Sequence, residues 1–185
     1  MKKHLSILAA LMFGLTLTGT AFAQNEGPEF PVIKDYGPVY RIPHAAEMPY
    51  QKQNIKTLFD LTKGAKDPAK VNPGLDHIAR YLNVYALAGV KPQNMHLVAI
   101  LHGKATAAVL TNQGYDHYMH TQSGNPNLKL LDALHKAGVT LYVCGQALHD
   151  FKYPASDVVP EVKRTLSALV VVTNYQEKHY AYFPM

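Results

Sequence analysis

The seven residues MHLVAIL at positions 95–101 decide the fold, because all but the second are apolar and His102 follows directly. An apolar run of this length without alternation predicts a strand that is covered on both faces, as in a parallel sheet between helices. A second buried strand is predicted at residues 139–143, and it runs directly into Cys144. Leucines recur at helical spacing within residues 128–135, between the two strands, and predict a helix there. The order is therefore strand, crossover helix and parallel strand.

The segments that precede this unit continue the same alternation of elements. Residues 55–61 alternate apolar and polar side chains, as a strand does, and residues 75–86 have the spacing of an amphipathic helix. Alternating strands and helices imply right-handed crossovers, so the predicted fold class is α/β, with a mostly parallel sheet and helices on both faces. Between these elements we expect a short helix at residues 106–110 and polar loops at residues 63–73 and 113–126.

The N-terminal residues predict export. Two lysines precede a largely apolar stretch that ends in AFA at positions 21–23, which offers small residues where a signal peptidase cuts. We therefore expect a signal peptide at residues 1–23, a periplasmic protein, and no later membrane span. Residues 24–53 are rich in proline and glycine and predict an irregular N-terminal arm, followed by one domain at residues 54–185.

Charge and motifs narrow the classes of partner. The chain has a formal charge of +5, which falls to +3 when Lys2 and Lys3 leave with the signal peptide. No basic run exceeds two adjacent charges, so we expect no nucleic-acid partner. The sequence contains neither a Gly-x-Gly-x-x-Gly fingerprint nor a P-loop, and we expect no bound cofactor.

The strand ends contain the candidate site, because ligands of open α/β sheets lie beyond the carboxyl ends of the strands. We predict Cys144 and His102 as catalytic residues, with Gly103, Gly145 and Gln146 as ligand-binding residues. A helix that begins near Gln146 would stabilise a thiolate at Cys144, because helix N-terminal amides lower the pKa of a thiol. His102 would act as a base or as an imidazolium partner.

Two alternatives stay open at this site. Cys144 is the one cysteine of the chain, which excludes an internal disulfide and a dithiol cycle, and a lone cysteine at a strand end is often a small core residue. His102 would then be a structural hydrogen-bonding residue.

A rival group is Asp116, His117 and His120, which have a spacing that suits zinc or copper. That spacing arises readily in a chain with ten histidines, and our prediction is that no metal is bound.

Three longer stretches resemble a known family. They are LVAILHGKATAAVL (97–110), NPNLKLLDALHKAGVTLYVCGQAL (125–148) and LSALVVVTNYQEKHYAYFPM (166–185). Strands that end in His-Gly and Val-Cys, and a terminal Tyr-Ala-Tyr-x-Pro, make the domain similar to the DsrE/DsrF-like family. VIKDYGPVYRIP (32–43) resembles the extension of exported members.

This resemblance implies a three-layer, flavodoxin-like fold with about five strands, and an assembly as a homotrimer or homohexamer. By pattern alone, residues 166–173 stay open between strand and helix. The pattern also favours a last strand at residues 180–184. The resemblance implies a strand at residues 161–167 and a helix at residues 168–177.

Some members of this family carry sulfur as a persulfide at the position of Cys144. The resemblance therefore implies an exported sulfur carrier or sulfurtransferase, or a thiol-redox protein, that uses Cys144 and exchanges sulfur with a donor or acceptor protein. The alternative is a non-catalytic, oligomeric small-molecule or metal-binding module of the periplasm.

Overall fold

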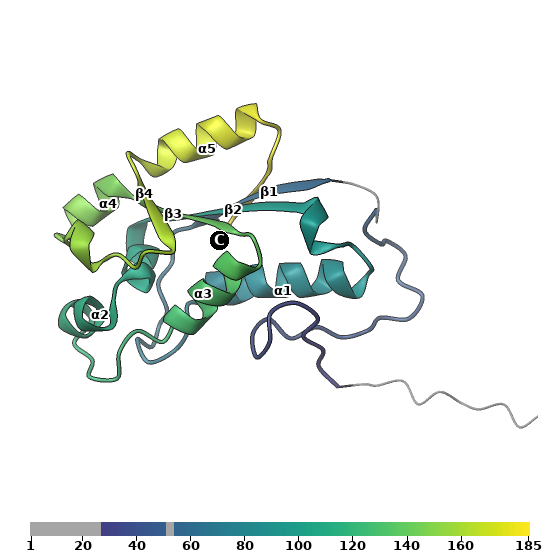
Figure 1. Cartoon of the computed structure of the whole chain (residues 1–185), viewed down its shortest axis with the longest axis horizontal. Helices are drawn as coiled ribbons and strands as arrows, with labels where there is room; N and C mark the ends of the chain where they lie inside the picture. Colours follow the sequence, from purple (N-terminus) through teal and green to yellow (C-terminus); the bar gives the residue numbers. More distant parts are fainter. Residues whose placement is uncertain (1–26, 51–53) are drawn as a thin grey trace, which may run out of the picture.

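The computed structural model describes residues 27–50 and 54–185 and contains a five-stranded sheet with the order β4-β3-β2-β1-β5 (Figure 1). All four strand pairs are parallel. The strands are β1 (Ile55–Leu61), β2 (Met95–Leu101), β3 (Thr140–Cys144), β4 (Val162–Thr165) and β5 (Ala181–Pro184). The predicted α/β fold with about five mostly parallel strands is confirmed, and the sheet is parallel throughout.

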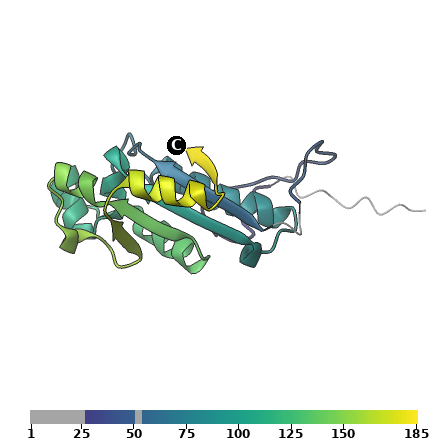
Figure 2. The ribbon, with the colours of Figure 1, turned by 90° about the horizontal axis from the view of Figure 1, so that it is seen from above.

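Helices cover both faces of this sheet, which gives three layers. Helices α1 (Pro73–Leu87) and α3 (Leu128–Lys136) lie on one face, and α5 (Ala168–Glu177) lies across the other (Figures 1 and 2). The shorter elements are α2 (Asn112–Met119), α4 (Gly145–Asp150) and the 3-10 helices η1 (Pro92–Asn94), η2 (Gly103–Val109) and η3 (Ala155–Asp157).

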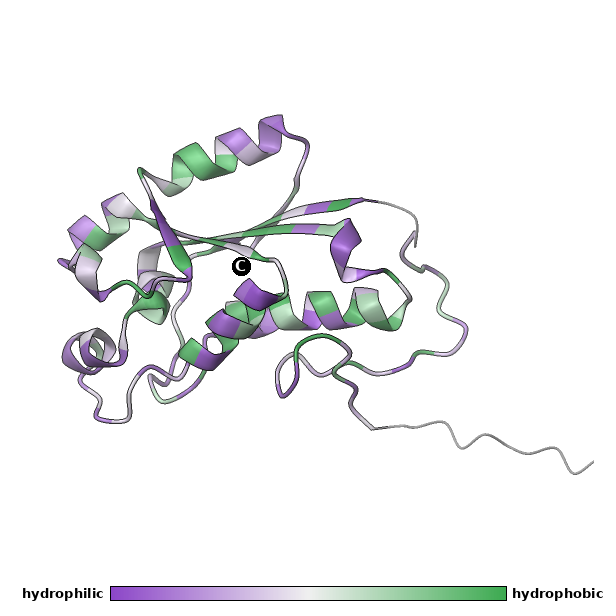
Figure 3. Ribbon diagram, in the orientation of Figure 1, coloured by the Kyte–Doolittle hydropathy of each residue, from purple (hydrophilic) through white to green (hydrophobic). Residues whose placement is uncertain are grey.

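The alternation of side chains along β2 explains why both faces are covered. Leu97 and Leu101 pack in the large apolar cluster on the side of α1 and α3, whereas Val98 and Ile100 pack in a smaller cluster beneath α5. A strand with two buried faces has to be apolar at nearly every position, as residues 95–101 are. The hydropathy colours of Figure 3 show hydrophobic residues along the strands, and hydrophobic and hydrophilic residues in alternation along α1 and α3.

One segment differs from the prediction made for it. The expectation of a polar loop at residues 113–126 is wrong for the first part, because α2 spans Asn112–Met119. The hydroxyl of Thr111 caps this helix by accepting from the N–H of Gly114 (3.2 Å), and Tyr115 is its main buried side chain. A cap and one buried ring specify this helix, so it lacks the repeated apolar spacing by which a helix is recognised.

At the C-terminal end, α5 and β4 lie where the family resemblance implies them. The alternative in which residues 166–173 form a strand is excluded, because α5 begins at Ala168. The side chain of Ser167 caps it by accepting from the N–H of Leu169 (3.3 Å). This cap starts a helix in a valine-rich segment whose side chains favour strands.

The described part of the arm, residues 27–50, lies against α1 without a helix or strand of its own. Asn83 of α1 holds it: its Oδ1 accepts from the N–H groups of Val32 and Ile33 (both 2.9 Å), and its Nδ2 donates to the carbonyls of Ile33, Tyr36 and Gly37. Asn83 is fully buried, so its amide replaces water for five backbone groups. The predicted signal peptide, residues 1–23, falls outside the described residues.

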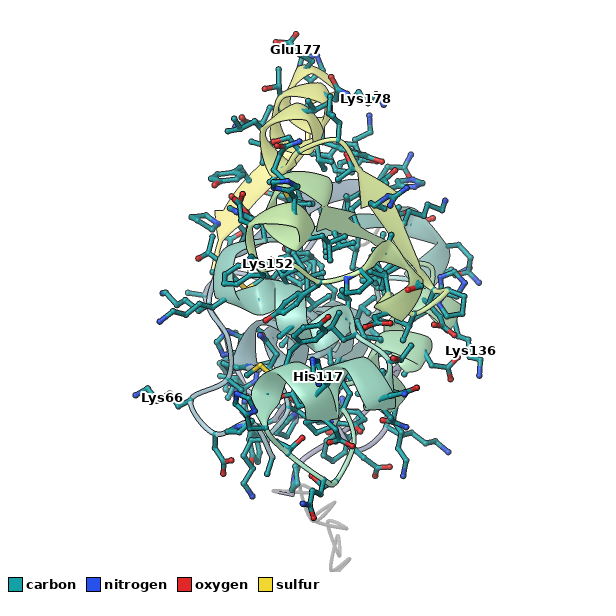
Figure 4. The ribbon with its side chains drawn as sticks, turned by 90° about the vertical axis from the view of Figure 1, so that its left-hand side faces the viewer. Lys66, His117, Lys136, Lys152, Glu177 and Lys178 are labelled. Atoms are coloured by element: carbon teal, nitrogen blue, oxygen red, sulfur yellow. The ribbon has the colours of Figure 1, made fainter. Side chains whose placement is uncertain are left out.

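Charged side chains lie around the outside of the molecule. The labelled lysines in Figure 4, among them Lys66 and Lys136, point outward on different sides of the domain. Within residues 27–50 and 54–185, no helix has both the length and the apolar character needed to cross a membrane.

Candidate functional site

The carboxyl ends of β1, β2 and β3 form one edge of the sheet, and the candidate residues meet there. From β1 the chain continues on one side to β2, β3 and β4, and it returns for β5 on the other side of β1. The point between β1 and β5 is therefore a topological switch point, where α/β sheets usually bind ligands.

Cys144 ends β3 and lies beneath the start of α5. Its side chain is 5% exposed, within the apolar cluster that includes Ile100 and Val171. Its Sγ accepts a hydrogen bond from the backbone N–H of Ala168, the first residue of α5, at 3.3 Å. The expected helix after Cys144 is α4, but Cys144 makes no side-chain capping bond to it. The helix N-terminus that meets the sulfur belongs to α5.

Gly145 and Gln146 hold the junction between β4 and α5. The side-chain amide of Gln146 donates to the carbonyl of Leu166 (3.3 Å), which places it on that junction rather than on the sulfur. A Cβ on Gly145 would lie 2.6 Å from the carbonyl oxygen of Thr165, closer than real Cβ contacts come. Gly145 is therefore required because the backbone of β4 approaches it closely.

His102 leaves the end of β2 and binds a buried carboxylate. Its Nε2 lies 2.6 Å from Oδ1 of Asp60, and the hydroxyl of Tyr182 donates to Oδ2 of the same residue, also at 2.6 Å. Burial raises the pKa of Asp60, but the hydrogen bonds from His102 and Tyr182 and the charge of His102 outweigh it, so its pKa is lowered. The bond to Asp60 raises the pKa of the Tyr182 phenol.

His102 and Cys144 are neighbours on the α5 face of the sheet. Leu101 pairs with Val143 in the register of β2 and β3, so the next residue on each strand is His102 and Cys144. Adjacent strands run about 4.8 Å apart. Ile100 packs in the cluster of Cys144, and His102 follows it by two residues in extended backbone, which places both side chains on one face.

Gly103 turns the chain out of β2 into η2. Its φ is +53°, a left-handed conformation that favours glycine, and a Cβ there would lie 3.1 Å from the carbonyl oxygen of Thr62. Gly103 therefore shapes the loop behind His102.

Two residues of this site, Asp60 and Tyr182, are absent from the set that the sequence predicts. Apolar and polar residues alternate along β1, so Asp60 reads as an ordinary polar position of a strand. No tyrosine is assigned to the predicted site. One signal was present for Asp60: it is an acidic residue next to last in a strand, at the edge where sites form. Nothing local marks Tyr182, because its role depends on β5 lying beside β1.

The rival metal group does not assemble. The carboxylate of Asp116 accepts from the hydroxyl of Thr121 (2.5 Å) and the N–H of Gly124 (2.9 Å), which ties the loop after α2. His120 adopts a left-handed φ of 54° at the end of that helix. Across the described ranges, no three His, Cys, Asp or Glu side chains are arranged to hold a metal ion.

A cavity of about 590 Å³ lies at the amino-terminal end of β1, lined in part by Ile55, Tyr81, Tyr85 and Phe183. It is at the opposite end of the strand from Asp60. We assign the candidate site to the carboxyl edge, because the side chains capable of proton or sulfur chemistry lie there.

The domain is similar to solved structures of the same fold. The ychN protein from E. coli matches with a TM-score of 0.52 and 14% identity, over 71% of this chain and 99% of that one. A protein of unknown function from Methanobacterium thermoautotrophicum matches with a TM-score of 0.50, at the same identity and coverage. At this identity the likeness concerns the fold alone. A search of curated protein sequences gives no match.

The model of one family covers most of the chain. The DsrE/DsrF-like family model matches residues 49–184, which include all five strands and every residue of the candidate site. The match agrees with the parallel sheet and with the resemblance noted in the sequence. The chain therefore belongs to the DsrE/DsrF-like family.

Proposed function

We propose that this protein carries sulfane sulfur as a persulfide on Cys144. Its family is generally linked to sulfur relay. The observation that carries the proposal is the hydrogen bond from the N–H of Ala168 to Sγ at the start of α5. An N–H donor and the positive end of a helix dipole favour the thiolate, which is the form that attacks sulfur.

The transfer balances without an oxidant. The Cys144 thiolate attacks the terminal sulfur of a donor persulfide, R–S–SH, and a new S–S bond forms while the donor S–S bond breaks. The donor leaves as the thiolate R–S⁻ with the electron pair of the broken bond, and Cys144 becomes Cys–S–SH. The reverse reaction, with an acceptor thiolate as the nucleophile, unloads the sulfur.

Access to the sulfur requires the junction between β4 and α5 to move. Leu166 and Leu169 flank Ala168 at this junction and are 71% and 79% exposed, respectively. The first half of α5 is hydrophobic and the second half hydrophilic in Figure 3. We propose that a protein partner covers these leucines, either a sulfur donor or acceptor, or another copy of the chain in a homotrimer or homohexamer.

We further propose that the protein acts in the periplasm after export. This proposal rests on the sequence of residues 1–23. N-terminal sequencing of the protein from the periplasmic fraction is expected to begin at Gln24. A mature chain that begins at Met1 in the cytosolic fraction would contradict it.

The decisive experiment incubates the native protein with a small-molecule persulfide and measures the intact mass. Wild-type protein is expected to gain one sulfur atom that a thiol reductant removes, and Cys144→Ser is expected to gain none. A wild-type mass that does not change, together with labelling of Cys144 only after unfolding, would refute the proposal.

The burial of Cys144 supports a second candidate, a non-catalytic oligomeric module of the periplasm that binds a small molecule or a metal and uses Cys144 for packing. Desolvation opposes a thiolate, and the sulfur fills an apolar cluster. In that case Cys144→Ala would remove no activity and cost only about 1 kcal/mol of stability, as a small cavity does. Light scattering of both proteins tests the assembly, and a monomer would contradict the oligomer.

A further inference from the structure

Asp60 connects two ring side chains from the strands on either side of it. Tyr182 on β5 donates to one carboxylate oxygen, and His102 at the end of β2 binds the other, both at 2.6 Å. The side chain of Asp60 is only 10% exposed. A buried carboxylate is costly unless both of its oxygens are hydrogen-bonded, and here both are.

This arrangement fixes the His102 ring. An ionised carboxylate only accepts hydrogen bonds, so Nε2 of His102 carries the hydrogen that lies between the two groups. Nδ1 is then the basic nitrogen of the neutral ring. Within the described chain the ring of His102 has no further hydrogen-bond partner, and its side chain is 29% exposed. The bond to Asp60 therefore defines the tautomer of His102 and leaves Nδ1 as the nitrogen that can accept a proton.

His102 and Cys144 lie at the ends of adjacent strands, at the same edge of the sheet. His102 and Cys144 follow a paired position of β2 and β3 and share the α5 face. An imidazole oriented by a carboxylate and placed beside a nucleophile is the usual arrangement for activating that nucleophile.

We propose that Asp60 and Tyr182 are positioning residues that hold His102 as the proton carrier of Cys144. The inference rests on the proposed persulfide function and adds how its thiol is activated. Neutral His102 takes the thiol proton of Cys144 on Nδ1, and the thiolate attacks the terminal sulfur of R–S–SH. The imidazolium then returns the proton to the leaving R–S⁻. The net change is Cys–SH + R–S–SH → Cys–S–SH + R–SH, and Asp60 stays ionised throughout.

The test is a double-mutant cycle on the reaction of Cys144 with iodoacetamide in the native protein, followed by mass spectrometry. His102→Ala is expected to slow alkylation about 100-fold, the lower end of the effect of a general base. Asp60→Asn is expected to slow it about 10–100-fold, as loss of a residue that orients a reactive side chain does. The double variant is expected to react no more slowly than His102→Ala, because Asp60 acts through His102.

Two further measurements distinguish residues that orient His102 from residues that only stabilise the fold. In the Asp60→Asn variant the new side-chain amide would present an N–H to Nε2, so the ¹⁵N shifts of His102 should report a reversed tautomer with the hydrogen on Nδ1. Added imidazole should restore part of the rate to His102→Ala and none to Asp60→Asn. Tyr182→Phe should lower the rate by a few-fold, because only one bond to Asp60 is lost.

The matched controls remove similar groups on the other side of the sheet. Asp76→Asn alters a carboxylate that accepts from the N–H of Gly37 (2.8 Å), and Tyr81→Phe removes a hydroxyl that is 2.9 Å from Thr57 Oγ1. Both are expected to leave the alkylation rate of Cys144 unchanged.

The outcomes distinguish this inference from the proposed function. Additive rate losses in the cycle, or an unchanged rate in His102→Ala, would overturn the positioning role even if the protein takes up sulfur. A non-additive cycle in a protein that never gains sulfur from a persulfide would leave the positioning role in place and overturn the persulfide function.

Discussion

Gly145→Ala should displace the β4–α5 junction, which covers Cys144. The new Cβ would lie 2.6 Å from the carbonyl oxygen of Thr165 and 3.4 Å from that of Leu166. Both are backbone atoms at the β4–α5 junction, so the junction has to shift instead of a flexible side chain. Overpacking of this kind costs roughly 1–3 kcal/mol. The displaced segment leads directly into Ala168, whose N–H binds Sγ of Cys144.

The magnitude follows from where the strain acts. If α5 opens locally to expose the sulfur, a ground state raised by about 1–3 kcal/mol makes opening about 5–150-fold more frequent. The alkylation rate of Cys144 by iodoacetamide, followed by mass spectrometry, should rise by that factor. The melting temperature should fall by roughly 2–4 °C for each kcal/mol.

Gly138→Ala is the matched control. Gly138 has a φ of +90° and an added Cβ would meet no atom within 4 Å, so this substitution is strained only in its backbone. That strain costs about 1–2 kcal/mol, similar to the cost at Gly145, but at the end of α3. It should lower the melting temperature and leave the alkylation rate unchanged. Equal acceleration in both variants would refute the reasoning, since labelling would then require global unfolding.

Three further predictions concern the arm and the carboxylate. Asn83→Ala should leave two N–H groups of the arm without partners, at a cost on the order of 2–6 kcal/mol, and limited proteolysis should then remove residues 27–50 faster than in wild type. Because the pKa of Asp60 is lowered on folding, its stabilisation is complete above the unfolded value near 3.8 and is lost as pH falls through the folded value. Denaturant titrations should therefore show Asp60→Asn less stable than wild type by roughly 1.5–3 kcal/mol near neutral pH, with the gap closing below pH 3.8. The pKa of Tyr182 is raised from 10.0, so the stability difference between wild type and Tyr182→Phe should persist below pH 10.0 and shrink as pH rises through the folded value; a difference independent of pH would contradict it.

The candidate site was partly accessible from sequence. Cys144 and His102 are predicted as site residues because each follows a buried apolar strand, and the strand-end rule needs no knowledge of partners. Their contacts were not accessible in this way. The sulfur meets the start of α5, 24 residues further along the chain, instead of the helix that follows it directly. Gln146 contacts a carbonyl of the β4–α5 junction for the same reason.

By itself, the sequence determined the parallel α/β fold, the bounds of β2 and the positions of α1 and α3, because the period of apolar residues reports local burial. Only the tertiary structure brought His102 and Tyr182 to Asp60, across 42 and 122 residues. Those contacts depend on the strand order, which places β5 beside β1, and on the register of both neighbours. A local pattern states that a side chain is buried, whereas its partner is set by the packing of segments that are distant in the chain.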